Sequence, residues 1–277
     1  MRILKFIGHN LKALSPAQWS LIGLVLIAAA AFFGFSESEF LQIDVSRSEL
    51  GISSTFLLGT DLLGRSILLK TLMGLGAAMG FGFISALIST TFGSAMGVFG
   101  GYFGKKIDLI VVGFYSVLDS VPYILLISCS ALVFGEGLFS LALIIGLTSW
   151  MKTCRLIRAE TLSLRQQDFL AASASLGSDD LRQIFIHILP NLMHLIRARF
   201  GIIFVLAIKL EIVLTYLGIG AQAGTISWGT VVFDGQEEIV KGGWTSLAAI
   251  SFMLFGLSLS VQRSTAVITK RGGPGRR

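Results

Sequence analysis

The sequence predicts an all-α integral membrane protein that crosses the bilayer six times, with both termini in the cytoplasm. Of its 277 residues, 53% are hydrophobic and only 14% are charged, and the mean hydropathy is +0.80. A single soluble core cannot bury so many apolar side chains. Long apolar runs recur along the chain, and lysines and arginines gather in every second connection between them. These two patterns predict the number of helices and their orientation.

Six apolar runs approach or exceed the length of about 20 residues that a helix needs to cross a bilayer. They lie near residues 17–35, 73–99, 108–134, 138–157, 196–217 and 244–262. The first run follows three basic residues, as in a signal peptide, but no convincing small-residue cleavage site comes after Phe35. We therefore expect an uncleaved first transmembrane helix.

The amino-terminal region is expected to lie partly on the membrane surface. Residues 3–14 place four aliphatic side chains on one helical face and Lys5, His9 and Lys12 off it, which predicts a short helix in the membrane interface. We expect residues 1–70 to contain this helix, the first transmembrane helix and an external loop. Residues 71–277 are expected to form a five-helix core with a cytoplasmic loop at 158–195.

The positions of the basic residues predict the orientation. The acidic residues lie mainly in the connections on the opposite side, which include the long loops at about 36–72 and 218–243. Because basic connections remain in the cytoplasm, these two loops are expected to face outward, where they are available to form a lid or to receive an external partner. The cytoplasmic basic residues are Arg2, Lys5 and Lys12, then Lys105 and Lys106, then Lys152, Arg155, Arg158, Arg165 and Arg182, and finally Arg263, Lys270, Arg271, Arg276 and Arg277.

One cytoplasmic segment, residues 168–191, has the pattern of a docking element. Gly177 is expected to adopt the left-handed conformation that closes one helix, and Ser178 to cap the next. Asp180 then lies where the helix dipole favours negative charge, and Pro190 is expected to disfavour continuation of this second helix. Apolar residues recur on one face of the second helix and leave that face for a partner: Leu181, Ile184, Phe185, Ile188 and Leu189.

Three charged residues fall within apolar runs, where charge is costly and therefore suggests a function. Asp119 lies three residues before Pro122, where the helix can already be broken and hydrated. Capping or water contact is as well supported there as a role in a transport path. Lys209 and Glu211 point to different faces of a helix, so we expect each to find a partner on another helix or subunit.

Small residues recur every four positions in the second apolar run, at Gly76 and Gly80 and again at Gly93, Gly97 and Gly101. This spacing lets two helices approach closely. Helix packing is the favoured interpretation, and a pathway-lining role for this run is the alternative.

The sequence contains no recognisable catalytic motif. The histidines lack HExxH spacing, and no GxSxG elbow is present. Cys129 and Cys154 match no metal or redox spacing. Residues 100–106 resemble a phosphate-binding loop only faintly, because the spacing is short and the following Ser or Thr is missing. No cofactor or metal is therefore predicted, and membrane orientation explains the basic residues better than nucleic acid does.

Three ordered segments resemble those of bacterial ABC importer permeases. The docking segment is similar to the cytoplasmic signature loop of that family at Ala171, Ala172, Ser173, Gly177, Leu189 and Pro190. Residues 58–66 read LGTDLLGRS, and residues 214–220 read LTYLGIG, followed by SWG at 227–229. These stretches resemble the LGTDxxGRD, LSFLGLG and SWG segments of the second permease subunit in dipeptide and oligopeptide importers, and Glu211 matches its usual acidic position. The ending of the docking segment at residues 187–191, HILPN, is similar to the peptide and nickel branch of the family.

The resemblance implies a type I ABC importer permease fold with a cytoplasmic coupling helix. It implies a multi-pass subunit of the bacterial cytoplasmic (inner) membrane that forms a translocation path, with peptides as the expected cargo. The implied partners are a second homologous permease subunit, two cytosolic ATPase subunits and an extracytoplasmic substrate-binding protein, and the lipid bilayer surrounds the spans. ATP hydrolysis is then expected in the separate ATPase subunits.

The docking segment, the charges within apolar runs and the resemblance together give the expected functional residues. Those expected to couple to the ATPase are Asp168, Ala171, Ala172, Gly177, Asp180, Leu181, Ile184, Phe185, Leu189 and Pro190, and those expected on the translocation path are Asp119, Pro122 and Glu211. Ala171 stands where the signature has Glu, and Ala174 stands at a commonly basic position. We therefore expect the loop to hold its ATPase through apolar and backbone contacts more than through charge.

Other functions remain open at this point. Nickel complexes or another small solute are alternative cargo. A self-sufficient secondary transporter would use Asp119 or Glu211 as an ion site, but such proteins tend to show internal repeats and none is convincing here. An intramembrane enzyme would need a paired nucleophile and base or a metal-ligand cluster. The docking segment has no purpose in either of these last two classes.

Overall fold

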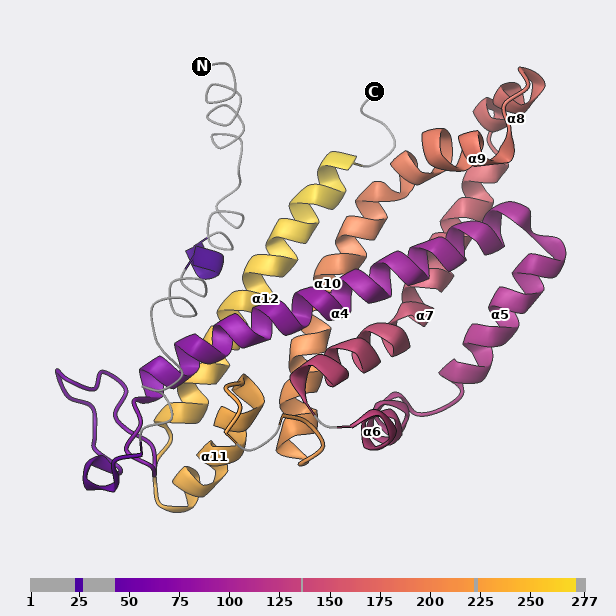
Figure 1. Cartoon of the computed structure of the whole chain (residues 1–277). Helices are drawn as coiled ribbons and strands as arrows, with labels where there is room; N and C mark the ends of the chain where they lie inside the picture. Colours follow the sequence, from indigo (N-terminus) through magenta and orange to yellow (C-terminus); the bar gives the residue numbers. More distant parts are fainter. Residues whose placement is uncertain (1–22, 27–42, 136, 222–223, 273–277) are drawn as a thin grey trace, which may run out of the picture. The chain divides into compact units, whose positions relative to one another are not determined.

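The structure, a computed structural model, describes residues 23–26, 43–135, 137–221 and 224–272, and nearly all of its regular structure is helical (Figure 1). The described elements from residue 43 onward are η1 (Val45–Arg47), α4 (Ile67–Phe103), α5 (Lys105–Asp119), α6 (Tyr123–Phe134), α7 (Leu138–Arg165), α8 (Asp168–Ser175), α9 (Asp180–Arg182), the π-helical segment η2 (Gln183–Ile188), α10 (Leu189–Tyr216), α11 (Trp228–Val240) and α12 (Thr245–Gly272). The all-helical prediction is confirmed for these residues.

The chain divides into two compact units that share long helices. One combines Met1–Phe81 with Ile208–Val267, and the other combines Gly82–Ala207 with Ile268–Arg277. The first unit therefore holds the described part of the 36–72 connection and α11, whereas the second holds α5 to α9 and the docking segment. Each unit has its own buried residues, such as Trp228 in the first and Trp150 in the second.

Several of the predicted spans are present as long apolar helices. Within the described residues, α4, α7 and residues 245–267 of α12 are long and apolar enough to cross a membrane, and the pair α5 and α6 adds a fourth if it counts as one span. The interfacial helix predicted at 3–14 and most of the first span lie outside the described residues. The fifth predicted span lies in α10, a 28-residue helix that carries Arg197, Arg199, Lys209 and Glu211 and is not among the helices that meet this test. The six-span topology and its orientation remain predictions.

The predicted third span is broken rather than continuous. Helix α5 ends at Asp119, α6 begins at Tyr123, and the two helices are bent by 87° at the break between them. Pro122 is the N-cap residue of α6, where its fixed φ and missing N–H are tolerated. Asp119 therefore lies at a helix end, as its position before Pro122 suggested.

The glycines of α4 bring it close to α7. A Cβ atom on Gly93 would lie 2.7 Å from the carbonyl oxygen of Trp150, and one on Gly97 would lie 2.8 Å from that of Cys154. A Cβ on Gly101 would lie 2.8 Å from the carbonyl oxygen of Arg158. Three successive glycines thus face three successive turns of α7, which confirms the packing interpretation for these positions. A Cβ on Gly80, by contrast, would meet no described atom within 4 Å, so this glycine makes no such contact.

The long connection at 218–243, which the sequence predicts to face outward, contains regular structure. It contains the 13-residue helix α11, which begins with a capping box in which Ser227 and Thr230 exchange side-chain and backbone hydrogen bonds. A capping box usually carries Glu or Gln at the third helical position, so Thr230 makes the signal weak in sequence.

Candidate functional site

The docking segment contains the left-handed turn that its sequence predicts. Gly177 has a φ of +83°. Its N–H donates to the carbonyl of Ala174 (2.9 Å), and the N–H of Ser178 donates to the carbonyl of Ser173 (3.2 Å). These two bonds form a Schellman motif, which closes α8 by satisfying carbonyls that the helix end leaves free.

The second helix of the segment differs from the prediction in two ways. Ser178 does not cap it: the N-cap residue is Asp179, which makes no side-chain cap bond. The helix also continues through Pro190 into α10 instead of ending there. The π-helical turn η2 directly precedes this proline, and Asn191 Nδ2 donates to the carbonyl of His187 (2.7 Å). The wider turn and this side-chain donor accommodate a residue that disrupts a regular α-helix.

The apolar face predicted for a partner is divided in the structure. Ile184 and Ile188 are buried against their own chain, so they are not available to a partner as expected. Leu181 and Phe185 are exposed, and Leu189 is half-buried. The exposed apolar side chains of this region form a patch, called the loop patch below, that consists of Phe169, Leu176, Leu181, Phe185 and Ile186. Asp168, Ala171, Ala172, Gly177, Asp180 and Pro190 are also exposed.

Contacts from α4 and within the segment fix its position. The hydroxyl of Tyr102 donates to Asp180 Oδ1 (2.8 Å), and Gln183 Oε1 lies 3.0 Å from the same hydroxyl. Ser173 Oγ and His187 Nε2 are 3.3 Å apart and join α8 to η2. The sequence named Asp180 but gave no indication of Tyr102, because Tyr102 lies 78 positions from Asp180 and nothing local to either one indicates the contact.

A buried apolar cluster packs against the same segment. Leu170, Ile184 and Ile188 pack with residues of α4, α7 and the start of α10, among them Val98, Tyr102, Ile157, Leu164 and Leu192. Figure 1 places α8 and α9 together beyond the carboxyl end of α7. The loop patch is thus held by a buried base while its own side chains remain exposed.

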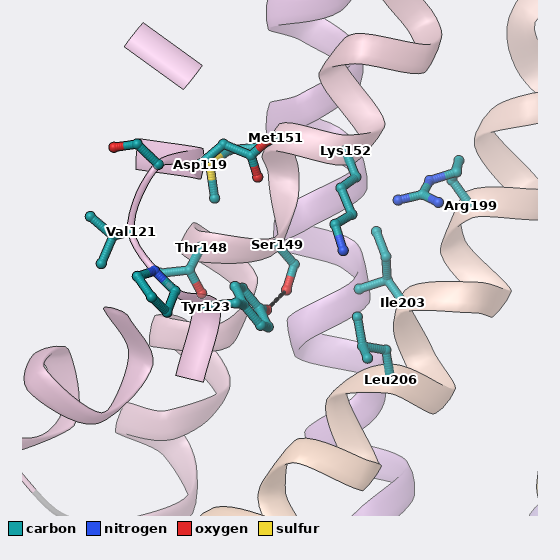
Figure 2. Close-up of a pocket in the computed structure, with 12 residues that line it drawn as sticks. Asp119, Val121, Tyr123, Thr148, Ser149, Met151, Lys152, Arg199, Ile203 and Leu206 are labelled. Atoms are coloured by element: carbon teal, nitrogen blue, oxygen red, sulfur yellow. Dashed lines mark hydrogen bonds between the residues drawn. The ribbon is translucent and has the colours of Figure 1, made fainter. Parts of the chain in front are cut away.

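Two of the three residues predicted for a translocation path lie on one cavity. Asp119 and Pro122 line a cavity of about 300 Å³ in the second unit, at the break between α5 and α6 (Figure 2). Asp119 Oδ2 accepts a hydrogen bond from Arg155 Nη2 (2.7 Å). The third residue, Glu211, belongs to the first unit and is 1% exposed. Its Oε1 accepts from Thr215 Oγ1 (3.1 Å), whereas its Oε2 has no hydrogen-bond partner among the described residues.

The segment that reads SWG, residues 227–229, lies next to Glu211. Ser227 caps α11, and the Nε1 of Trp228, which is fully buried, donates to the carbonyl of Thr71 (2.9 Å). A Cβ on Gly229 would lie 2.5 Å from Thr215 Cβ and 2.7 Å from Glu211 Oε1. Only glycine therefore allows α11 to lie this close to α10.

A second polar centre lies in the first unit, within the segment that reads LGTDLLGRS. Asp61 is 1% exposed, and its Oδ1 accepts from the backbone N–H of Leu63 (3.0 Å) and of Arg65 (2.8 Å). Its Oδ2 accepts from Arg65 Nε (2.7 Å) and Lys70 Nζ (3.0 Å). Arg65 and Lys70 also pair with Asp234 of α11 at 3.0 Å and 2.5 Å. These four side chains, called the outer ion cluster below, join the two loops expected to face outward.

The environment of Asp61 favours its charged form. Burial by itself raises the pKa of its carboxyl, but the ammonium of Lys70, the N–H of Arg65 and the guanidinium of Arg65 together outweigh burial, so the pKa lies below its ordinary value. The sequence marks the Asp61 segment only through resemblance and shows no sign of its contacts with Lys70 and Asp234. These two residues are 164 positions apart in the chain.

No group of three or more His, Cys, Asp or Glu residues that would hold a metal ion occurs within the described residues. The arrangement consists instead of exposed apolar side chains on a rigidly based loop, a cavity at a broken helix and a buried ion cluster.

Comparison with known proteins shows that the chain is similar to membrane components of transport systems. Residues 89–272 match the family model described as a binding-protein-dependent transport system inner membrane component. The chain is 30% identical over 248 residues to the oligopeptide transport system permease protein OppC of Bacillus subtilis, which covers 88% of this chain and 81% of that protein. It is 29% identical to the dipeptide transport system permease protein DppC of the same organism. That alignment covers 89% of this chain and 78% of DppC. It is 28% identical to the OppC protein of Escherichia coli, over 90% and 82%.

Proposed function

We propose that this chain, which belongs to the family of binding-protein-dependent transport system inner membrane components, is a permease subunit of an ATP-driven importer for peptides. The observation that carries the proposal is the match of residues 89–272 to that family, which spans the docking segment, the end of α4 and the long helices α7, α10 and α12. Peptides are proposed as cargo because relatives that align over most of the chain are named as oligopeptide and dipeptide permeases.

The chain provides a path and a mechanical connection rather than a chemical reaction. The proposed assembly contains a second permease subunit, two cytosolic ATPase subunits that hydrolyse ATP, and an external protein that delivers the peptide. Its place is the bacterial inner membrane, with the docking segment in the cytoplasm. The outer ion cluster then lies on the external side and holds the outward loops that would meet the delivery protein.

The loop patch is the proposed contact with the ATPase. Exposed apolar patches on a protein surface commonly mark sites of protein–protein interaction. Leu181 and Phe185 are 57% and 60% exposed, although the helix that carries them is anchored by buried neighbours. Ala171 and Ala174 provide no charge where the signature has Glu and a commonly basic residue, so the exposed apolar side chains of the loop patch are the proposed anchors of this contact. Closure of the ATPase pair would then move the anchored segment as a rigid body.

Isolation of the assembly tests the proposal directly. A tagged chain purified from its native membranes is expected to bring with it an ATPase and a second permease subunit, identified by mass spectrometry. A preparation without any ATPase would overturn the assignment. Cells that lack the chain are expected to lose uptake of peptides, and loss of nickel uptake instead would keep the permease role but replace the cargo.

A charged substitution in the loop patch sharpens this test. Phe185→Asp should weaken ATPase retention by about 2 kcal/mol, roughly 30-fold, because a large apolar anchor is replaced by a carboxylate. Val240→Asp is the matched control, since Val240 is 85% exposed and lies on α11, outside the loop patch. Equal retention of the ATPase by both variants would show that the patch is not the contact.

A further inference from the structure

The cavity at the break between α5 and α6 has an unusual distribution of charge. Its walls come from the break itself, from α7 and from α10, and it encloses about 300 Å³. Figure 2 shows Lys152 extending into it from α7 and Arg199 extending toward α7 from α10. Both positions belong to predicted membrane spans or their ends, where a charged side chain is costly unless it is paired or hydrated.

The two cations of this cavity differ from their neighbours on α7, which are paired. Arg155 pairs with Asp119, and Arg158 forms a double hydrogen bond with Asp108. Within the described residues, no carboxylate lies within 4.0 Å of Lys152 or Arg199 in an ion pair, and the polar contact that Arg199 does make is from its Nε to Thr153 Oγ1 (3.3 Å). Asp119 is the acidic residue among the described residues that line the cavity, and its carboxylate is already paired with Arg155. No described carboxylate therefore forms an ion pair with Lys152 or Arg199.

The remaining walls suit a small organic ligand. Ile203 and Leu206 supply an apolar side next to the cations, and the hydroxyls of Tyr123 and Ser149 form a hydrogen-bonded pair (2.5 Å) across from them (Figure 2). The volume is at the small end of the range for ligand pockets, about 300–1,000 Å³, and fits one end of a peptide better than a long chain. An apolar wall beside a few convergent polar groups is the usual design of such a pocket.

We propose that Lys152 and Arg199 form a subsite for the carboxylate group of the transported solute, which assigns the cargo to peptides with a free carboxyl terminus. This inference rests on the proposed transport function and adds the group that the path recognises. A guanidinium binds a carboxylate through two parallel hydrogen bonds, and an ammonium adds a point charge. Lys152 is exposed, so a carboxylate can reach its ammonium and leave it again, as a path requires. A bare metal cation is disfavoured here by both charges.

The test uses the complete transporter in vesicles of phosphatidylethanolamine and phosphatidylglycerol, with radiolabelled trialanine as the probe. Arg199→Gln and Lys152→Gln should each reduce the initial uptake rate below saturation about tenfold per amount of assembled complex, the effect of losing one hydrogen bond to a charged group. Arg197→Gln is the matched control, because it makes the same change two residues away at an exposed position that does not line the cavity. Arg199→Lys retains the charge and should keep most of the uptake.

Each outcome decides between the two proposals. If the wild-type assembly takes up trialanine and the two cavity variants equal it, the subsite is wrong and the transport function stands. If Arg197→Gln lowers uptake as much as Arg199→Gln, the effect is one of general charge and the subsite is also wrong. If the losses vanish in phosphatidylcholine vesicles, the cations bind an anionic lipid headgroup instead. A wild-type assembly that takes up no peptide overturns both proposals. If Arg199→Gln fails to assemble, Lys152→Gln, whose side chain is exposed, decides alone.

Discussion

Replacement of Gly177 by valine tests the docking segment at its most demanding position. The φ of Gly177 is +83°, in the left-handed region, and a Cβ there would meet no atom within 4 Å. The substitution therefore changes backbone preference without creating a collision. An L-residue in this region costs about 1–2 kcal/mol, and a β-branched one is at the unfavourable end of that range.

The strain acts at the end of α8, a short helix with few buried contacts to hold it. Helix α8 has eight residues, and Leu170 is its buried residue. The two Schellman bonds at Gly177 and Ser178 hold its end, so a change of φ at Gly177 breaks both. A penalty of about 2 kcal/mol lowers the population of the docking-competent loop by up to 30-fold, and the apparent affinity for the ATPase falls by the same factor.

The assay compares peptide uptake and ATP hydrolysis by reconstituted transporters at equal membrane levels. Gly177→Val should lose uptake and retain less ATPase, whereas Gly177→Asn should stay within about threefold of the wild type because asparagine tolerates the left-handed region. Gly177→Ala should fall between them. Normal uptake by Gly177→Val would refute the reasoning, since it would mean that the loop works without this turn.

Two further changes test the packing and the outer ion cluster. Gly97→Ala should destabilise the protein by about 1–3 kcal/mol, seen as a lower melting temperature in detergent, because its Cβ meets the backbone of α7 at 2.8 Å. Gly80→Ala on the same helix should be neutral or stabilising, since its Cβ meets nothing, and equal effects of the two would contradict the contact. Asp61→Asn should lower the free energy of unfolding by about 3 kcal/mol. This is the lower end of the range for a broken buried ion pair, because Asp234 still pairs with Lys70. The folded-state pKa of Asp61 lies below its ordinary value of 3.8, so its contribution is present above that pH and is lost as the pH falls through the folded-state pKa. Melting temperatures from pH 7 downward should therefore converge for wild type and Asp61→Asn in acid, and a constant gap would contradict the assignment.

Local features of this fold could be predicted from the sequence. The turn at Gly177 follows from a glycine after a short helical pattern, and the Schellman bonds are made within six residues of chain. The contacts of Gly93, Gly97 and Gly101 follow from a spacing of four, which keeps small residues on one helix face. The break near Pro122 was signalled by the proline and by Asp119 just before it.

Features that depend on distant contacts could not be predicted in the same way. The apolar stripe on the second helix gives no indication of which of its members face the chain's own core, so Ile184 and Phe185 looked equivalent although one is buried and the other exposed. The residues of the outer ion cluster come from two loops, and a single sequence contains no sign that Lys70 meets Asp234. Hydropathy depends on composition and not on the direction of the helix axis. A pair of helices bent by 87° therefore has the same apolar profile as one straight helix.

The docking segment and the cavity belong to the same compact unit, and this has a mechanical consequence under the proposed function. The cluster below the loop patch includes Ile157 of α7, and the same helix holds Asp119 at the cavity through Arg155. Glycine contacts between α4 and α7 leave no slack for these helices to slide independently, because packed backbones resist continuous deformation. A displacement of the loop by the ATPase would therefore reach the cavity through α7 as a whole. Lys152 on α7 would then move with it, and the distance to Arg199 on α10 would set how tightly a carboxylate is held in each state.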